Sequence, residues 1–412
     1  MGIEFSLSGK QKELQSAVRQ LAKSVVRPQS LKWDHDHEID PDFLRNLAMM
    51  ASSMGQSGLG SSASLMRQEE EAPDPNSNDT KSRSQNLTTV LASEEMAWGD
   101  AALLLCVPGP GLGGPPVRAS GTPEQKQRFF SIFDDLQVLK WGAYALTEPN
   151  AGSDVSGIRT SCRKDGTHWV INGRKCYITN GARASWNVVF ATVDPALGRA
   201  GHRAFVVEKG TPGFSVGRIE DKMGLRASET AELVFEECRV PAENLLGGEE
   251  KYQTKEGFMT AMKTFDNTRP IVASMAIGIG RAAYEYARDF VKDHYVLSRP
   301  IPRYAALAER LARIGRGLAA ARMVTWRAAW LADEGASNAK EASMAKAMAG
   351  QVAIRACIDA IEICGAEGSI QTEHALLEKW FRDIKVYDIF EGTGQIQRIV
   401  ISKRLMTDLK SF

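Results

Sequence analysis

One carboxylate near the C-terminal end of the chain has the surroundings of a general base. Glu391 follows the apolar residues Ile389 and Phe390 and precedes the sequence Gly-Thr-Gly at 392–394. Apolar neighbours raise the pKa of a carboxyl group toward neutrality, and glycines let a substrate approach the backbone closely. A glutamate followed by glycine is also common in ordinary exposed turns, so this stretch alone leaves both interpretations open.

Two polar segments in the middle of the chain could bind an electron-poor ring that has carbonyl edges and a reducible nitrogen. One segment runs from Tyr144 to Asp154, and the other runs from Lys175 to Gly181. Each offers a hydroxyl or a backbone donor beside a turn. Either segment alone also fits a capped turn with no ligand.

Composition limits the class of protein. A chain of 412 residues predicts two or three domains. The 51 basic and 50 acidic residues nearly balance, which argues against a nucleic-acid surface. No apolar run has the length of a membrane span, and no signal or transit segment is recognised, so we expect a soluble cytoplasmic protein. Six scattered cysteines without a CxxC pair predict reduced thiols and neither disulfides nor a metal site.

The first third of the chain reads as helices with one interruption. Apolar spacing predicts a helix over 8–28 that ends at Pro28, followed by a short helix over 41–50. The Gly, Ser and acidic composition of about 55–85 predicts a mobile surface loop. Thr122 before Pro123 predicts a further helix start.

A glycine pattern at 109–114 matches the letters of GxGxxG but does not predict a dinucleotide loop. Pro115 and Pro116 follow it immediately, and no strand–helix–strand unit surrounds it. Such a loop must follow a strand and open a helix.

The remaining elements define the architecture. Short β-type runs separated by turns predict a β-barrel-like middle domain over 141–254, with a type I′ hairpin turn at Asn172-Gly173. Long amphipathic stretches predict a C-terminal four-helix bundle over 255–412, and the N-terminal α-helical domain covers 1–140. The expected fold class is therefore α+β multidomain.

These motifs, in this order, resemble the acyl-CoA dehydrogenase family over essentially the whole chain. The segment Phe265-Asp-Asn-Thr-Arg-Pro270 and the Glu391 loop are most similar to the medium-chain type, in which the helix after the β domain opens with Phe-Asp-x-Thr-Arg-Pro. The resemblance implies FAD-dependent α,β-dehydrogenation of a fatty acyl-CoA to the trans-2-enoyl-CoA, with electrons passed to an electron-transferring flavoprotein. An acyl-CoA oxidase and a non-catalytic partner subunit are the alternatives.

The resemblance also implies a role for the glutamate. Glu391 would remove the α-proton, and hydride would pass from the β-carbon to flavin N5. The backbone N–H of Glu391 and a flavin ribityl hydroxyl would stabilise the enolate-like oxygen. Some family members, including the isovaleryl type, carry the base at the position of Thr268; threonine cannot act as a base, which leaves Glu391 alone.

Further contacts are implied position by position. Tyr177 stands where a tryptophan packs on the flavin ring, and Thr179 stands where a hydroxyl lies near N5. The positions implied to contact FAD are Tyr144, Leu146, Thr147, Gly152, Ser153, Tyr177, Thr179, Thr393 and Gln395. The positions implied to contact substrate or CoA are Ser153, Asp266, Arg269, Glu391 and Gly392.

Three departures from the family pattern affect assembly and specificity. The segment His294–Ser298 replaces Arg-x-x-Phe-Gly, and Glu362–Gly368 replaces Gln-Ile-x-Gly-Gly-x-Gly, which in the family lie on the adenine side of a neighbouring subunit's FAD. Losing an arginine and gaining a carboxylate there weakens phosphate binding. We therefore expect either a heteromer with a homologous subunit or a homo-oligomer with altered FAD binding, a tetramer in either case. The family's Pro-x-Glu-Tyr-Gly-Gly is missing around 55–70, so acyl chain length stays open.

Overall fold

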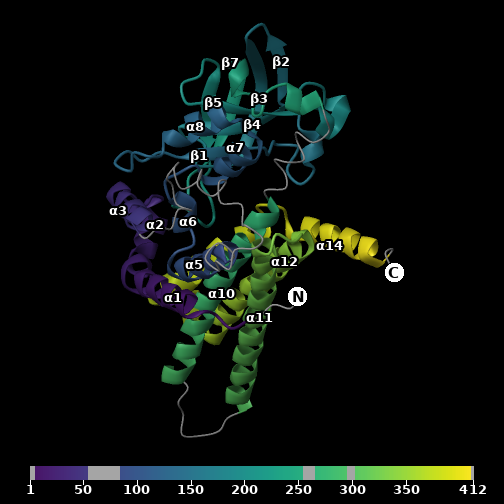
Figure 1. The fold of residues 1–412 in the computed structure, drawn as a ribbon. Helices are drawn as coiled ribbons and strands as arrows, with labels where there is room; N and C mark the ends of the chain where they lie inside the picture. The colour runs from purple at the N-terminus through teal and green to yellow at the C-terminus, as the bar shows by residue number, and fades with distance from the viewer. Residues whose placement is uncertain (1–4, 54–83, 254–264, 295–301, 410–412) are drawn as a thin grey trace.

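The computed structural model describes residues 5–53, 84–253, 265–294 and 302–409. In those residues, most helices from the two ends of the chain lie together below the sheet in Figure 1, α7 and α8 lie beside its strands, and the long helices α10, α11 and α12 extend away from it. This agrees with the predicted fold class. The predicted loop at about 55–85 falls almost wholly outside the described residues.

Local capping signals set the N-terminal helices. Ser8 starts α1 and Thr122 starts α8, each through a capping box with the glutamine three residues later. Pro28 does not end the first helical run, because it lies in a 3₁₀ turn, Arg27–Gln29, whose first positions need no N–H bond. The helices are α1 (Gly9–Leu21), α2 (Ser30–Asp36), α3 (Pro41–Ser53), α5 (Gln85–Gly99), α6 (Leu103–Cys106), α7 (Gly114–Ser120) and α8 (Pro123–Ser131).

The middle of the chain forms one seven-stranded sheet in the order β1-β4-β2-β3-β7-β6, with β5 added on β4. Most neighbours are antiparallel, while β1 and β2 run parallel to β4. The strands are β1 (Gly142–Ala145), β2 (Ser161–Asp165), β3 (His168–Thr179), β4 (Trp186–Thr192), β5 (His202–Glu208), β6 (Phe214–Ile219) and β7 (Thr230–Pro241).

The predicted hairpin turn at Asn172-Gly173 is wrong, because both residues lie inside β3. The chain reverses at Gly166-Thr167 between β2 and β3. Gly173 meets a different need: its φ is 148°, and a Cβ there would lie 2.6 Å from Thr160 Oγ1. Glycine at 173 therefore permits a close approach of Thr160 at an irregularity in the β3–β7 register.

In the described part of the chain, the α-helices that follow the sheet are α10 to α14, and α12 packs against each of the other four. Small residues allow this packing: a Cβ on Gly280 of α10 would lie only 2.9 Å from Ala353 of α12. The helices are α10 (Phe265–His294), α11 (Pro302–Asp333), α12 (Ala339–Ile363), α13 (Gln371–Ile384) and α14 (Gly394–Leu409). No helix in the described part of the chain is both long enough and apolar enough to cross a bilayer.

The end of α13 connects the three parts. Asp383 accepts a hydrogen bond of 2.6 Å from the backbone N–H of Leu225 in the sheet region. Lys379 forms ion pairs with Asp383 at 2.6 Å and with Asp100 of the N-terminal part at 2.9 Å. A 3₁₀ turn, Lys385–Asp388, then leads into the Glu391 loop and α14. The loop is therefore held where the bundle meets the sheet.

Candidate active site

Glu391 lies in a left-handed backbone conformation. Its φ is 53° and that of Gly392 is 96°. A non-glycine residue with positive φ is uncommon and is often found at functional sites. The residue is partly exposed, but protein surrounds its carboxyl group, and this burial raises the pKa of Glu391 above its ordinary value.

Polar groups on α10 and α12 partly oppose that rise. Thr268 Oγ1 donates a hydrogen bond of 2.8 Å to Glu391 Oε2. The positive charges of Arg269 and Lys346 act in the same direction and favour the carboxylate, so the net pKa of Glu391 is raised by less than burial alone would cause. The structure thus places Thr268 beside the base.

The turn after Glu391 is anchored by its neighbours. Lys346 Nζ donates to Gly392 O at 2.7 Å, and Gln397 Nε2 donates to the same oxygen at 3.0 Å. Thr393 Oγ1 accepts from the N–H of Ile396 at 3.3 Å and so caps α14. Thr393 therefore has a structural task in this chain. Gln395, in the first turn of α14, is exposed.

Strand β1 brings the sheet to this loop. The Tyr144 ring packs at 5.0 Å from the Phe190 ring in the sheet. Burial raises the pKa of the Tyr144 phenol, and the charge of Glu391 raises it further. The charge of Glu391 therefore reaches the Tyr144 phenol, which places the Glu391 loop on the side of the sheet that carries β1.

A buried ion pair joins the two polar segments predicted from the sequence. Lys175 Nζ donates to Glu148 Oε1 at 2.7 Å and to Leu146 O at 3.0 Å. The N–H of Cys176 donates to Thr147 O at 2.9 Å. Both polar segments therefore lie side by side. Sequence reasoning quoted Glu148 and Lys175 within these segments but did not identify their pairing, because nothing local shows that the lysine is buried.

Several residues of these two segments are exposed at the surface of the described chain. Tyr177 is 64% exposed. Its φ of 59° coincides with an irregularity in the β3–β7 register. Thr179 is half-buried at the end of the same strand, and Gly152 and Ser153 are exposed. A Cβ placed on Gly152 would meet no atom within 4 Å, so packing within the described chain does not require a glycine there. An open face beside an exposed aromatic ring fits a flat ligand.

Some predicted positions lie at the limit of the described structure. Asp266 is in the first turn of α10, but its side chain is outside the described residues. Residues 295–298 lie wholly outside the described residues. His294 ends α10, and its ring stacks on the ring of Phe290. Glu362, expected to repel a phosphate, forms an ion pair of 2.8 Å with Arg310. That arginine offsets part of the expected repulsion.

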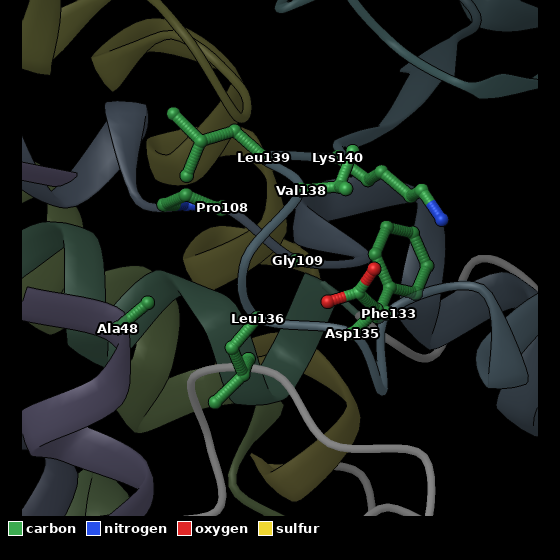
Figure 2. A pocket seen from close by; sticks show the side chains of 9 residues that line it. All are labelled: Ala48, Pro108, Gly109, Phe133, Asp135, Leu136, Val138, Leu139 and Lys140. Carbon is green, nitrogen blue, oxygen red and sulfur yellow. The ribbon is translucent and has the colours of Figure 1, made fainter. Parts of the chain in front are cut away.

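A small hollow elsewhere in the molecule is separate from this site. Figure 2 shows it between α3 and the segment that precedes β1. None of the predicted site residues lines it. Its lining residues are Ala48, Pro108, Gly109, Phe133, Asp135, Leu136, Val138, Leu139 and Lys140.

Comparison with known families supplies the deciding observation. Residues 143–238 match the model "Acyl-CoA dehydrogenase, middle domain", and residues 255–406 match "Acyl-CoA dehydrogenase, C-terminal domain". The chain belongs to the acyl-CoA dehydrogenase family. It is thus an oxidoreductase of a flavoprotein family, as the sequence motifs indicated.

Individual relatives are similar to this chain over nearly its full length. The short-chain specific acyl-CoA dehydrogenase of Clostridium acetobutylicum is 33% identical over 98% of this chain and 100% of its own. The butyryl-CoA dehydrogenase structure from Megasphaera elsdenii has a TM-score of 0.83 at 32% identity, covering 98% of this chain and 100% of that one. A chain in a structure described as the electron transferring flavoprotein of Acidaminococcus fermentans has a TM-score of 0.79 at 33% identity, covering 98% and 99%. The fold prediction is confirmed.

Proposed function

We propose that this acyl-CoA dehydrogenase uses FAD to oxidise short-chain acyl-CoA thioesters, with Glu391 as the base for the α-proton. The observation that carries this proposal is the Glu391 carboxyl group itself. It is enclosed by protein, has a raised pKa, is hydrogen-bonded to Thr268 and acts through its charge on Tyr144 of the sheet. A carboxylate with a raised pKa is a better proton acceptor near neutral pH.

The protein's own groups would perform the proton transfer and bind the thioester. Glu391 takes the α-proton and becomes neutral, while its backbone N–H donates to the thioester carbonyl oxygen and stabilises the negative charge that develops there. Arg269 and Gly392, beside the carboxyl group, would bind the thioester end of the substrate, with Ser153 and Asp266 as further contacts. FAD, when bound, supplies the acceptor for the hydride that leaves the β-carbon.

The residues present fit such a cofactor. The exposed Tyr177 ring and the open space over Gly152 offer a flat surface and a close backbone approach. Leu146 and Thr147 are held against β3 by their carbonyl contacts with Lys175 and Cys176. The residues that we propose to contact FAD are Tyr144, Leu146, Thr147, Gly152, Ser153, Tyr177, Thr179, Thr393 and Gln395.

Names of the relatives support the substrate and the electron acceptor. A short-chain specific enzyme and a butyryl-CoA dehydrogenase match nearly the whole chain, which favours a short acyl group, although the sequence motifs resemble the medium-chain type. The structure described as an electron transferring flavoprotein supports that class of protein as the electron acceptor. The segments that begin at His294 and Glu362 depart from the family's motifs on the adenine side of FAD. This departure favours an FAD site completed by a second, homologous subunit; a homotetramer is the alternative.

Anaerobic flavin bleaching tests the proposal. Wild-type protein and Glu391→Gln are purified alone, their flavin content is measured, and acyl-CoAs of increasing chain length are added. We expect butyryl-CoA to bleach the wild-type flavin, while Glu391→Gln binds flavin but loses at least about 10³-fold in bleaching rate, because an amide cannot take the proton. The cytoplasmic location stays a prediction.

Each alternative has its own outcome in this experiment. If the wild type holds flavin and no acyl-CoA bleaches it, the dehydrogenase proposal fails. Peroxide formation in air with the same substrate would instead identify an oxidase. Full flavin occupancy without any partner protein would count against the heteromer.

A further inference from the structure

One buried lysine is hydrogen-bonded to the Glu391 loop and lies outside the sequence motifs described above. Lys346 is on α12, and only 1% of it is exposed. Burying a lysine is costly, because the ammonium group leaves water and must be compensated by nearby acceptors or negative charges. What Lys346 contacts therefore shows what the lysine stabilises.

Lys346 is bonded to the loop that carries the base. Its Nζ donates to Gly392 O at 2.7 Å, directly after Glu391 in the chain. The charges that act on it are those of Asp388 and Glu391, which favour its ammonium form, and of Arg269 on α10, which opposes it. Burial is the largest influence and lowers the pKa of Lys346 to about 8. The charges of two carboxylates, Glu391 in the loop and Asp388 shortly before it, and of one arginine on α10 thus act on this lysine.

The backbone of this loop needs external support. Glu391 and Gly392 both have positive φ, which for Glu391 costs conformational energy that its surroundings must offset. The Gly392 carbonyl receives two donors, Lys346 Nζ and Gln397 Nε2 at 3.0 Å, and both are buried. A Cβ on Gly392 would lie 2.5 Å from Gln397 Nε2, so the loop and its donors are closely packed.

We propose that Lys346 is a positioning residue for Glu391: its ammonium group holds the left-handed Glu391–Gly392 turn through the Gly392 carbonyl and, together with Arg269, supplies positive charge that favours the ionised form of the base. This inference rests on the proposed role of Glu391 as base. It adds that the base depends on a cation from α12 besides the Thr268 hydroxyl and Arg269 of α10.

Two substitutions separate charge from packing. Lys346→Met keeps the length and apolar stem but removes the charge and the donor, while Lys346→Arg keeps the charge. Lys379→Met is the matched control, because Lys379 is also buried and paired with carboxylates but contacts Asp100 and Asp383 rather than the Glu391 loop. Glu391→Gln completes the set.

The first readout does not depend on activity. Infrared difference spectra of flavin-loaded protein, recorded against pH, show the protonated carboxyl band that Glu391→Gln lacks. We expect Lys346→Met to shift the titration of this band upward by about one pH unit, because removing a neighbouring positive charge raises a carboxyl pKa. Lys346→Arg should titrate close to the wild type, and Lys379→Met should lower thermal stability without moving the band.

The second readout is the pH profile of butyryl-CoA oxidation. In Lys346→Met the acidic limb of kcat should move upward by the same interval, giving about a 10-fold loss of kcat on that limb and a smaller change in KM. A folded Lys346→Met protein whose band and acidic limb stay at the wild-type pH would overturn the proposal. If Lys346→Met does not fold, a Lys346→Arg protein with both titrations displaced by a unit or more would overturn it equally.

The two proposals can fail separately. If Glu391→Gln keeps wild-type kcat, the base assignment is wrong whatever Lys346 does. If Glu391→Gln loses activity while Lys346→Met titrates as the wild type, only the positioning role of Lys346 is wrong.

Discussion

At the scale of single residues, the site depends on opposing effects on one carboxyl group. Burial raises the pKa of Glu391, while the Thr268 hydroxyl and the charges of Arg269 and Lys346 hold it down. A base benefits from both effects: burial makes the carboxylate a stronger proton acceptor, while the hydroxyl and the positive charges favour its ionised form. Thr268 is thus not a substitute base but the direct hydrogen-bond donor to the base.

Removing that donor gives a direct prediction. Thr268→Val keeps the shape of the side chain and removes the hydrogen bond to the carboxylate, so the pKa of Glu391 should rise by about one further unit. The acidic limb of the kcat profile for butyryl-CoA should therefore move upward, with activity near the upper end of the pH range nearly unchanged. Thr325→Val is the control, because Thr325 is also a helical threonine but is fully buried and donates to Ala321 O in α11 rather than to Glu391. An unchanged acidic limb in Thr268→Val would refute this account.

At the scale of elements, two glycines that look alike in the sequence do different work. Gly173 lies inside β3, where its positive φ and the nearby Thr160 exclude a Cβ. Gly152 lies in the exposed turn after β1, where a Cβ would meet no atom of the described chain within 4 Å. Packing within the protein therefore explains the glycine at 173. For Gly152 we infer that a bound ligand, FAD, is what requires the absence of a side chain.

This difference can be measured with two alanine substitutions. Gly152→Ala should leave the thermal unfolding temperature within about 1 °C of the wild type, since a surface change of this kind alters stability little, but weaken FAD binding several-fold. Gly173→Ala should lower the unfolding temperature, because the new methyl group overlaps Thr160. Flavin release on dilution and calorimetry of the flavin-free proteins give the two quantities. Equal FAD affinity in Gly152→Ala and the wild type would exclude the close approach that we propose.

At the scale of the whole molecule, α13 fixes the base relative to the sheet. Lys379 is only 2% exposed and pairs with Asp383 on its own helix and with Asp100 from the N-terminal part. Asp383 in turn holds the backbone of Leu225 in the sheet region. One buried cluster therefore joins the three predicted domains directly before the Glu391 loop.

Breaking this cluster should loosen the whole molecule. Lys379→Met leaves two buried carboxylates without their cation, and removing one partner of a buried pair costs about 3–5 kcal/mol. We expect a clear fall in the unfolding temperature, measured at fixed scan rate, with no shift in the titration of Glu391. Lys32→Met is the control, because Lys32 pairs with Asp36 on the exposed face of α2 and should change the unfolding temperature little. Equal unfolding temperatures for the two variants would contradict this role of α13.

The sequence by itself determined those features that depend on near neighbours. The caps at Ser8 and Thr122 involve residues three positions apart, and the helical and β-type periods are properties of short windows. Residue order was also enough to identify the family, whose models match the middle and C-terminal parts of the chain. Glu391 could therefore be identified as the candidate base from the sequence, without the tertiary structure.

Only the tertiary structure decided which groups face that base and which turns exist. Asn172-Gly173 has the local preference of a hairpin, but pairing with β2 and β7 places both residues within β3. Lys346 and Lys175 read as ordinary lysines, yet folding buries both beside carboxylates from distant parts of the chain. Burial and charge pairing are long-range properties, because they depend on the distance between groups in the folded molecule rather than on their separation in the sequence.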